Sequence, residues 1–440
     1  MNQETALAIL KKRSSVYLTG PAGSGKTYLL NLFVAYLKEK KIKVAVTAST
    51  GLAATHLSGR TIHSWSGIGI GKKLDATAWK KIKSNRQLRK RVLEVEVLII
   101  DEISMLHDYQ LDMIDEICRH FRKSAISFGG IQVVMCGDFF QLPPVGEENG
   151  SANFVMQAAV WQKMSLKICY LDKVYRQSDE KLTEILNRIR GKEIDDDLFS
   201  YLDGMIEEER KFSLRPARLY AHNIAVDSIN LQELRKIKDG PMLYYMHQRG
   251  SNDRLLESLK GACQASEKLV LKKGAVVMFI KNNPDLGYAN GTIGEVIGFE
   301  EENKFPIIRI SDGQEIIASP ESWTIDDEDG KALALVTQVP LKLAWAITIH
   351  KSQGMTLDAV EMDLSKCFAY GMGYVALSRA KSLKSIKLLG LSYRALEVDP
   401  KIFEADKLLQ EWSAAVEREY LKNKPKSLKE KIKDKILGKK

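Results

Sequence analysis

The sequence predicts an α/β protein of two lobes, each built on a parallel sheet, with a small β-barrel inserted into the second lobe. Apolar runs that suit buried strands alternate with helical patterns from Val16 to Leu171, which is typical of parallel sheets covered by helices. A second alternating segment begins near Asp179 and resumes over Leu341–Leu391. The interruption, Gly287–Val339, is rich in strand patterns and Gly-containing turns, spaced like the hairpins of a small barrel.

The strands expected in the first lobe share one property, because each ends where a polar or Gly-rich motif begins. They are Val16–Thr19, Val44–Thr47, Val97–Ile100, Ile131–Gly137 and Leu166–Leu171. Since doubly wound sheets bind ligands at the carboxyl ends of their strands, we expect a site along this edge. Arg218–Ala221 and Val276–Lys281 are the strands expected early in the second lobe.

The 440-residue length agrees with about three domains. We expect a first lobe over residues 1–178, with a wedge and a basic segment at about 64–91. A second lobe would cover 179–285 and 339–405, the barrel 286–338 and a basic tail 406–440.

Composition argues against a membrane protein or a disulfide-rich one. No apolar run reaches the ~18 residues needed to cross a bilayer, and Met1–Thr5 does not resemble a signal peptide. The five cysteines are widely spaced and mostly lie in apolar stretches, which favours core positions over disulfides or a zinc site. We therefore expect a soluble, intracellular protein, cytoplasmic and nucleoid-associated if bacterial, and monomeric in solution.

The segment after the first strand matches the phosphate-binding P-loop, Gly-x-x-x-x-Gly-Lys-[Ser/Thr]. Its residues, all candidate ATP contacts, are Gly20, Pro21, Ala22, Gly23, Ser24, Gly25, Lys26 and Thr27. In such a loop, glycines let backbone N–H groups surround phosphate oxygens, the lysine meets the β- and γ-phosphates, and the hydroxyl holds Mg²⁺. A helix expected over Tyr28–Tyr36 would point its positive end at the phosphates.

A second buried strand, Val95–Ile100, ends on two carboxylates. Asp101 is placed to hold Mg²⁺, and Glu102 to orient or deprotonate the attacking water. A Gly-rich turn and an acidic strand end each occur by chance, but here both fall at element boundaries, as hydrolysis requires. Together they predict a nucleoside triphosphatase that uses ATP and Mg²⁺.

Three further side chains are candidates for sensing or stabilising the transferred phosphate. Gln141, in Gly137–Pro144, suits a contact with both the γ-phosphate and the attacking water. Arg176 and Arg379 are candidate arginine fingers, whose fixed forks neutralise charge that develops on the phosphoryl group. Either arginine alone also fits a surface ion pair. With the motifs around them, both imply a cleft that closes between two lobes.

Positive charge is concentrated in two segments. Lys72–Arg91 holds nine Lys or Arg against one acid, and Leu421–Lys440 holds nine Lys against two acids, within a net charge of +10. Clustered charge of this kind drives sequence-independent binding to nucleic acid. Either segment alone also fits a solvated helix face.

The run Leu111–Val145, with its Gly-Asp-Phe-Phe-Gln-Leu-Pro-Pro stretch, resembles the signature that separates the Pif family of DNA helicases from its RecD and Dda relatives in superfamily one. Motifs of such helicases match in order from Gln3 to about Gly390. The resemblance implies that both lobes are RecA-like. Tyr288–Val296 is similar to the entry of the family's small barrel of Src-homology type.

The resemblance also implies roles for single residues. Gln3 and Tyr175 stand where these helicases contact adenine, and Gln353 and Gly354 lie in a motif similar to the one that couples nucleotide to DNA. The residues that would contact DNA are Thr50, Gly51, His63, Trp65, Phe139, Pro143, Asn223, His350 and Lys351. Other interpretations stay open, since Trp65 alone also fits the core, His350 a structural residue and Phe139 a stiff loop.

The function implied by the resemblance is an ATP-dependent DNA helicase that moves 5′-to-3′ on single-stranded DNA and acts on forks, RNA–DNA hybrids and G-quadruplexes. A strand-separating wedge is expected near Ile68–Lys73. The alternative is an ATPase that remodels or regulates DNA complexes without unwinding, but Gln353 and Arg379 argue against a one-lobe protein. A small-molecule kinase would leave the clustered charge unexplained.

We expect binding to single-stranded DNA to weaken steeply with salt and to depend little on sequence, as phosphate-dominated recognition does. Deleting Leu421–Lys440 should flatten this salt dependence without loss of ATPase activity, because no motif lies there. The measurement is DNA affinity against salt concentration for the truncated and full-length chains. Equal slopes would mean that the tail does not contact DNA.

Overall fold

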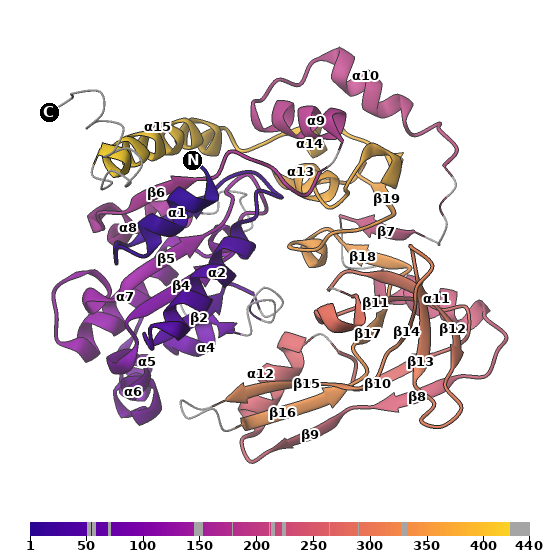
Figure 1. Ribbon diagram of the computed structural model, residues 1–440, viewed down its shortest axis with the longest axis horizontal. Coiled ribbons are helices and arrows are strands. Elements are labelled where there is room, and N and C mark those ends of the chain that lie inside the picture. The colour runs from indigo at the N-terminus through magenta and orange to yellow at the C-terminus, as the bar shows by residue number, and fades with distance from the viewer. Residues whose placement is uncertain are drawn as a thin grey trace, which may run out of the picture.

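The computed structural model describes residues 1–50, 54, 59–68, 72–144, 153–177, 179–210, 212, 216–221, 226–263, 265–288, 290–326 and 332–422. Gly51 and Asn223, both expected to contact DNA, lie outside the described residues, as does the chain beyond Lys422. Two α/β lobes lie side by side, and long antiparallel strands extend from the second lobe (Figure 1).

The first lobe is built on a six-stranded sheet in the order β3-β2-β4-β5-β1-β6, in which all pairs are parallel. Its strands are β1 (Val16–Thr19), β2 (Val44–Ala48), β3 (Arg60–Thr61), β4 (Val97–Asp101), β5 (Gln132–Cys136) and β6 (Lys167–Tyr170). The parallel sheet expected from the sequence is confirmed. Only β3 was not expected, because two residues are too few to show an apolar pattern.

Helices cover both faces of this sheet. They are α1 (Gln3–Leu10), α2 (Lys26–Glu39), α4 (Ile62–Ser66), α5 (Ala76–Ser84), α6 (Arg86–Glu94), α7 (Asp108–Arg122) and α8 (Ala159–Lys163). Val97 and Ile99 of β4 belong to an apolar cluster with α1 and α2, whereas Leu98 and Ile100 belong to a cluster with α7. Because successive side chains are buried on opposite faces, the strand is a continuous apolar run in the sequence.

A four-stranded parallel sheet, in the order β18-β7-β19-β20, forms the centre of the second lobe. Its strands are β7 (Ala217–Tyr220), β18 (Ala346–Thr348), β19 (Val360–Asp363) and β20 (Ile386–Gly390). The helices of this lobe are α9 (Glu180–Arg190), α10 (Asp196–Gly204), α11 (Val226–Lys236), α13 (Met372–Leu377) and α14 (Tyr393–Leu396). Neighbouring strands β7 and β18 are far apart in sequence, so the chain between them is an insertion.

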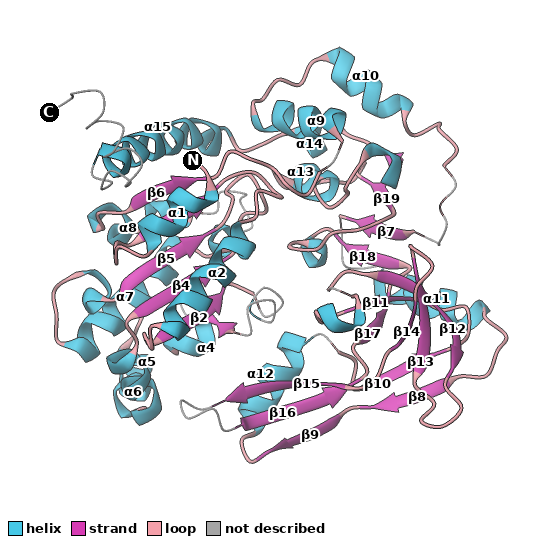
Figure 2. Ribbon diagram, viewed as in Figure 1, coloured by secondary structure: helices cyan, strands magenta, loops and turns pink. Residues whose placement is uncertain are grey.

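Among the described residues, the insertion forms three antiparallel sheets, drawn as the lower right part of Figure 2. The strands are β8 (Met242–Tyr245), β9 (His247–Gly250), β10 (Lys268–Leu271), β11 (Val276–Phe279), β12 (Ile293–Phe299), β13 (Pro306–Ile310), β14 (Glu315–Ile317), β15 (Glu321–Asp326), β16 (Ala332–Gln338) and β17 (Leu341–Leu343), with helix α12 (Asp253–Cys263) beside them. The segment Val276–Lys281 was expected in the α/β unit of the second lobe. It contains β11, which instead pairs antiparallel with β12 and β17. That assignment was wrong because a short apolar run does not specify its partner strands.

The last described helix, α15 (Pro400–Lys422), returns to the first lobe and lies along β6 (Figure 1). Its buried positions include Leu409 and Ser413, and the Ser413 hydroxyl accepts the Tyr170 N–H at 2.9 Å. Residues 406–422, expected as the start of a basic tail, are therefore part of a packed helix. This helix covers the edge strand β6, whose backbone groups would otherwise be open to pairing.

None of the helices within the described ranges is both long and apolar enough to cross a membrane. All five cysteines are buried and free, as their apolar surroundings predicted.

Candidate functional site

The P-loop connects β1 to α2 through a backbone that only glycine accepts at two points. Gly20 and Gly25 have φ angles of 140° and 80°. A Cβ on Gly20 would lie 2.3 Å from the Leu171 carbonyl oxygen, and one on Gly25 would lie 2.3 Å from Nε2 of Gln3. Because Gly25 is the N-cap of α2 and has no side chain to cap it, the first N–H groups of α2 remain available to an anion.

Lys26 lies across this loop, and its ammonium donates to the carbonyl oxygens of Gly20 at 2.9 Å and Pro21 at 3.0 Å. The hydroxyl of Ser24 is buried without a hydrogen-bond partner among the described residues. A flexible cation, an unpaired hydroxyl and a helix N-terminus at one loop suit a triphosphate. The residues present therefore fit the nucleotide that the motif implies.

Two carboxylates stand at the end of β4, the neighbour of β5 in the sheet. Asp101 is the last residue of that strand and accepts the Glu102 N–H at 2.9 Å. Glu102 adopts the left-handed conformation, with φ of 51°, which strains a non-glycine residue and is frequent at active sites. Burial and the charge of Asp101 raise the pKa of Glu102 to about 7, a value that suits a general base near neutral pH.

The second lobe contributes polar side chains to the same place. The Gln353 amide donates to Glu102 Oε2 at 3.0 Å, and a Cβ on Gly354 would lie 4.0 Å from Glu102 Oε1. Arg379, just after α13, is 1% exposed, and burial and the nearby Arg176 lower its pKa to about 9. The pKa of Arg176 is lowered by burial, while the carboxylate of Glu102 opposes this shift in both arginines. The structure thus brings Glu102, both arginines and Gln353 together at the junction of the lobes.

Gln141 lies in the loop after β5, where its backbone N–H donates to the Asp138 carbonyl at 3.0 Å. Its side chain is buried, and the amide oxygen has no partner among the described residues. The loop packs against the start of α13, because a Cβ on Gly371 would lie 2.4 Å from the Phe140 carbonyl oxygen. A buried, unpaired amide at the carboxyl edge of the sheet agrees with the expected phosphate-sensing role.

Gln3 and Tyr175, expected at the adenine, flank the P-loop. The Gln3 amide donates to the Ser24 carbonyl at 3.2 Å, and the Tyr175 N–H donates to the Gly23 carbonyl at 2.8 Å. The Tyr175 ring is 54% exposed, so one flat aromatic face beside the loop is open to a purine ring.

Three residues that sequence reasoning missed also belong to this site. The hydroxyl of Tyr374, in α13, accepts the N–H of Ala22 in the P-loop at 2.9 Å and lies 3.1 Å from Asp138 Oδ2. Arg190, the last residue of α9, donates to both carboxylate oxygens of Asp138 at 2.8 Å. Asp138 lies inside the motif of Gln141, which was a usable signal, but neither Arg190 nor Tyr374 had one.

Five of the residues expected to contact DNA are at least partly exposed, and their roles stay predictions. Thr50 and Pro143 are half-buried, and Lys351 is exposed. The half-buried His350 ring lies 6.4 Å from the ring of the exposed Phe368, nearly parallel to it. His63 is also half-buried, with Nε2 2.8 Å from the Gln110 amide nitrogen; burial lowers its pKa.

Trp65 and Phe139 were expected to contact DNA and do not fit that role in this structure. Trp65 is 2% exposed, because α4 turns its indole into the core cluster of the first lobe, which also includes Leu88 and Val92. Phe139 is 5% exposed and packs its ring 5.2 Å from that of Tyr17. A base cannot stack on an aromatic face that the core already covers, so the core interpretation holds for Trp65, and Phe139 is buried in the same way.

The basic segment after the expected wedge folds into α5 and α6, which protrude at the lower end of the first lobe in Figure 1. Asp75 and Asn85 cap the two helices by accepting N–H groups with their side chains. The exposed basic residues of this surface are Lys72, Lys73, Lys80, Lys81, Lys83, Arg86, Arg89 and Lys90. Residues 69–71, inside the expected wedge, lie outside the described ranges.

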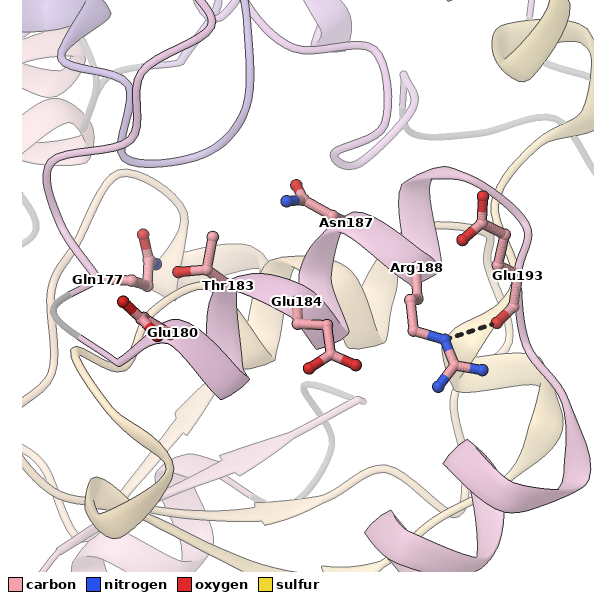
Figure 3. Close-up of a pocket in the computed structure, with 7 residues that line it drawn as sticks. All are labelled: Gln177, Glu180, Thr183, Glu184, Asn187, Arg188 and Glu193. Atoms are coloured by element: carbon pink, nitrogen blue, oxygen red, sulfur yellow. Dashed lines mark hydrogen bonds between the residues drawn. The ribbon is translucent and has the colours of Figure 1, made fainter.

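A separate polar cavity of about 560 Å³ lies along α9, and Figure 3 shows its lining side chains. Three of them, Glu180, Glu184 and Glu193, are acidic, and Arg188 donates to the Glu193 carbonyl at 3.2 Å. With three acids and one base, the lining carries a net negative charge that repels phosphate groups. We therefore assign the nucleotide to the P-loop and not to this cavity.

The fold and the site define a P-loop nucleoside triphosphatase whose candidate catalytic groups come from two lobes. Comparison with known proteins narrows this class. The model of the PIF1-like helicase family matches residues 2–211, and that of the DNA helicase Pif1 2B domain matches residues 254–299. Because the chain is also 42% identical to a Pif1 helicase of which it covers 72%, it belongs to the PIF1-like helicase family.

Individual relatives agree with this assignment. The chain is 42% identical to the ATP-dependent DNA helicase Pif1 of a Psychrobacter species, over 96% of this chain and 72% of that protein. It is 35% identical to the Homo sapiens ATP-dependent DNA helicase PIF1, over 91% of this chain, and spans 62% of that longer protein. The solved structure of Bacteroides Pif1 with ADP-AlF4 superposes with a TM-score of 0.80 at 29% identity, covering 93% of this chain and 96% of that one. The same protein bound to single-stranded DNA gives a TM-score of 0.64 at 30% identity, with 92% and 95% covered.

Replacing Glu102 should make stability less dependent on pH. Since its folded-state pKa of about 7 exceeds the ordinary value of 4.5, the folded chain binds the proton more tightly than the unfolded chain. Proton binding to Glu102 therefore stabilises the folded chain fully below the ordinary pKa of 4.5, and this stabilisation is lost as the pH rises toward 7. We expect the melting temperature of Glu102→Gln to exceed that of wild type by a margin that grows between about pH 5 and 8. Glu301→Gln, at an exposed turn, is the control, and a margin independent of pH would contradict the prediction.

Arg379→Ala should lower ATP turnover by at least two decades, because removing an arginine finger costs roughly 10³–10⁵ in phosphoryl-transfer enzymes. Arg176→Ala should behave similarly. The measurement is steady-state turnover at saturating single-stranded DNA. Arg379 also donates to the Val375 carbonyl at 2.9 Å, so thermal unfolding is the necessary folding control. A folded variant with near wild-type turnover would mean that Arg379 of the second lobe takes no part in hydrolysis.

Proposed function

We propose that this chain is an ATP-dependent DNA helicase that moves 5′-to-3′ on single-stranded DNA and unwinds duplexes, RNA–DNA hybrids and G-quadruplexes. The observation that carries the proposal is the 3.0 Å hydrogen bond from Gln353 to Glu102. Gln353 lies shortly after His350 and Lys351, which are two of the expected DNA contacts of the second lobe. A strand held there would therefore act on the hydrolytic carboxylate through a three-residue turn, His350–Ser352.

The cofactors of the proposed reaction are ATP and Mg²⁺. Thr27, at the first turn of α2, and Asp101, at the end of β4, would hold the ion. When bound, the ion supplies positive charge that neutralises the phosphate oxygens. These two residues offer the hydroxyl and carboxylate oxygens that Mg²⁺ prefers.

Four side chains have separate roles in the proposed hydrolysis of ATP. Glu102 takes a proton from the attacking water, and its pKa near neutrality lets it do so at physiological pH. Lys26, Arg176 and Arg379 supply positive charge where negative charge develops on the transferred group. Because both arginines depend on the second lobe for their position, hydrolysis and lobe closure are coupled.

DNA as the partner is supported by the family and by surface charge. Bacteroides Pif1, a member of the same family, has been solved with single-stranded DNA. The exposed basic surface of α5 and α6 supplies the positive charge that backbone phosphates require. In this proposal the two parallel-sheet lobes move on the strand, while the antiparallel sheets are an accessory part.

An unwinding assay with 5′-tailed and 3′-tailed duplexes tests the proposal. We expect ATP-dependent unwinding of the 5′-tailed duplex alone. Lys26→Ala should abolish it, because that variant lacks the only side-chain cation of the P-loop, and Glu102→Gln should bind ATP without hydrolysing it. Unwinding from the 3′ tail would overturn the direction. DNA-stimulated hydrolysis without unwinding of either duplex would favour the remodelling ATPase instead.

A further inference from the structure

The guanidinium of Arg190 joins side chains from four other segments of the chain. Besides Asp138, it donates through Nη1 to the Tyr374 hydroxyl at 3.1 Å and through Nη2 to the Tyr170 hydroxyl at 2.8 Å. Asp406 of α15 lies 3.4 Å from Nη2. The plane of the guanidinium also lies over the Phe140 ring, 4.1 Å from its centroid. A planar group with five donors is the side chain that can satisfy so many partners at once.

This cluster is buried and electrostatically paired. Arg190 is 7% exposed and Asp138 is 1% exposed. Burial alone would raise the pKa of Asp138, but the charges of Arg190 and Lys26 hold it below its ordinary value. Asp138 is therefore ionised when folded, and removing the guanidinium would leave a buried charge without its partner, which is strongly destabilising.

The hydroxyl of Tyr374 extends the cluster to the P-loop. It accepts the Ala22 N–H at 2.9 Å and donates to Asp138 Oδ2 at 3.1 Å. A chain of hydrogen bonds thus runs from a backbone N–H of the phosphate loop, through α13, to the carboxylate and then to Arg190. Ala22 lies in the P-loop, which would bind the triphosphate. The hydrogen bonds at this end of the series therefore belong to the nucleotide site and not to the general core.

The same cluster is linked to two segments that carry candidate phosphate contacts, the Gln141 loop and the chain that leads to Arg379. The Asp138 carbonyl accepts the Gln141 N–H at 3.0 Å, so the carboxylate and the sensing glutamine share one tight loop. Tyr374 lies in α13, and the chain from α13 leads directly to Arg379. A shift of α13 that broke the Tyr374 contacts would therefore move Arg379 and release the P-loop together.

We propose that Tyr374 and Arg190 are positioning residues that couple the P-loop and the Gln141 loop to the second lobe, so that DNA bound between the lobes stimulates hydrolysis. The inference rests on the proposed function, because DNA-stimulated hydrolysis is the effect that it explains. It assigns no contact with the nucleotide to either residue.

The test replaces Tyr374 by Phe, which removes the hydroxyl and keeps the ring. Tyr288→Phe is the matched control, because the Tyr288 hydroxyl is also buried and donates to a carboxylate, that of Glu321, at 3.1 Å, but lies in the inserted antiparallel region. We expect Tyr374→Phe to lower the DNA-stimulated kcat about tenfold while the KM for ATP changes little, as loss of positioning predicts. Tyr288→Phe should keep wild-type turnover.

Amide hydrogen exchange supplies a readout that needs no nucleotide. In the protein without ATP, the Ala22 N–H should exchange about tenfold faster in Tyr374→Phe than in wild type or in Tyr288→Phe, because its acceptor is gone. Arg190→Lys keeps the charge beside Asp138 but not the fork, and it should reproduce the kinetic loss. Adding Tyr374→Phe to Arg190→Lys should cost little more, since the two residues act as one unit.

A merely structural cluster would behave differently. Tyr374→Phe would then lower the melting temperature while leaving kcat and DNA stimulation at wild-type values, and that result would overturn the inference. Fully additive losses in the double variant would overturn it as well. Failure of the proposed function is a separate result, in which the wild-type chain itself shows no DNA-stimulated hydrolysis while exchange at Ala22 still responds to Tyr374→Phe.

Discussion

The pairing of buried charges across the junction of the two lobes is the constraint on which the rest of the site depends. The first lobe supplies the carboxylates of Asp101, Glu102 and Asp138, and its own cation at this place is Lys26. Guanidinium groups from later in the chain complete the pairing. Arg190 forms an ion pair with Asp138 at 2.8 Å, and Arg379 lies close enough to Glu102 to affect the pKa of that carboxyl. Because an uncompensated buried charge costs several kcal/mol, neither lobe reaches its stable arrangement without the other.

This constraint explains why the site holds features that stability alone would remove. Glu102 keeps a left-handed backbone and a pKa raised by burial. The side chains of Ser24, Gln141 and Gln353 each leave a buried oxygen without a partner among the described residues. Unpaired groups of this kind lower stability, but they converge where a phosphate and an attacking water would be bound. These features lower folding stability, but they place the polar groups of the site before a nucleotide binds.

The basic surface that we propose to face DNA is organised by a different principle. The exposed lysines and arginines of α5 and α6 need no fixed geometry, since attraction to backbone phosphates acts through the whole field of the surface. The aromatic residues expected to stack on bases behave otherwise, because Trp65 and Phe139 fill the core of the first lobe. Positive charge on this lobe is thus open to solvent while its large rings support the sheet, and the exposed Phe368 beside His350 is an aromatic surface of the second lobe.

The sequence by itself determined the parts of this protein that depend on local pattern. Five of the six strands of the first sheet, the P-loop and the carboxylates after β4 follow from apolar runs and from glycine spacing, and both are visible within a few residues. The tertiary structure decided what depends on distant partners. It placed β11 in an antiparallel sheet, turned Trp65 and Phe139 inward, and joined Asp138, Arg190 and Tyr374 on one hydrogen-bonded cluster. Neither Arg190 nor Tyr374 stands out in the sequence, because the partners that make each of them necessary are brought beside it only when the two lobes pack together.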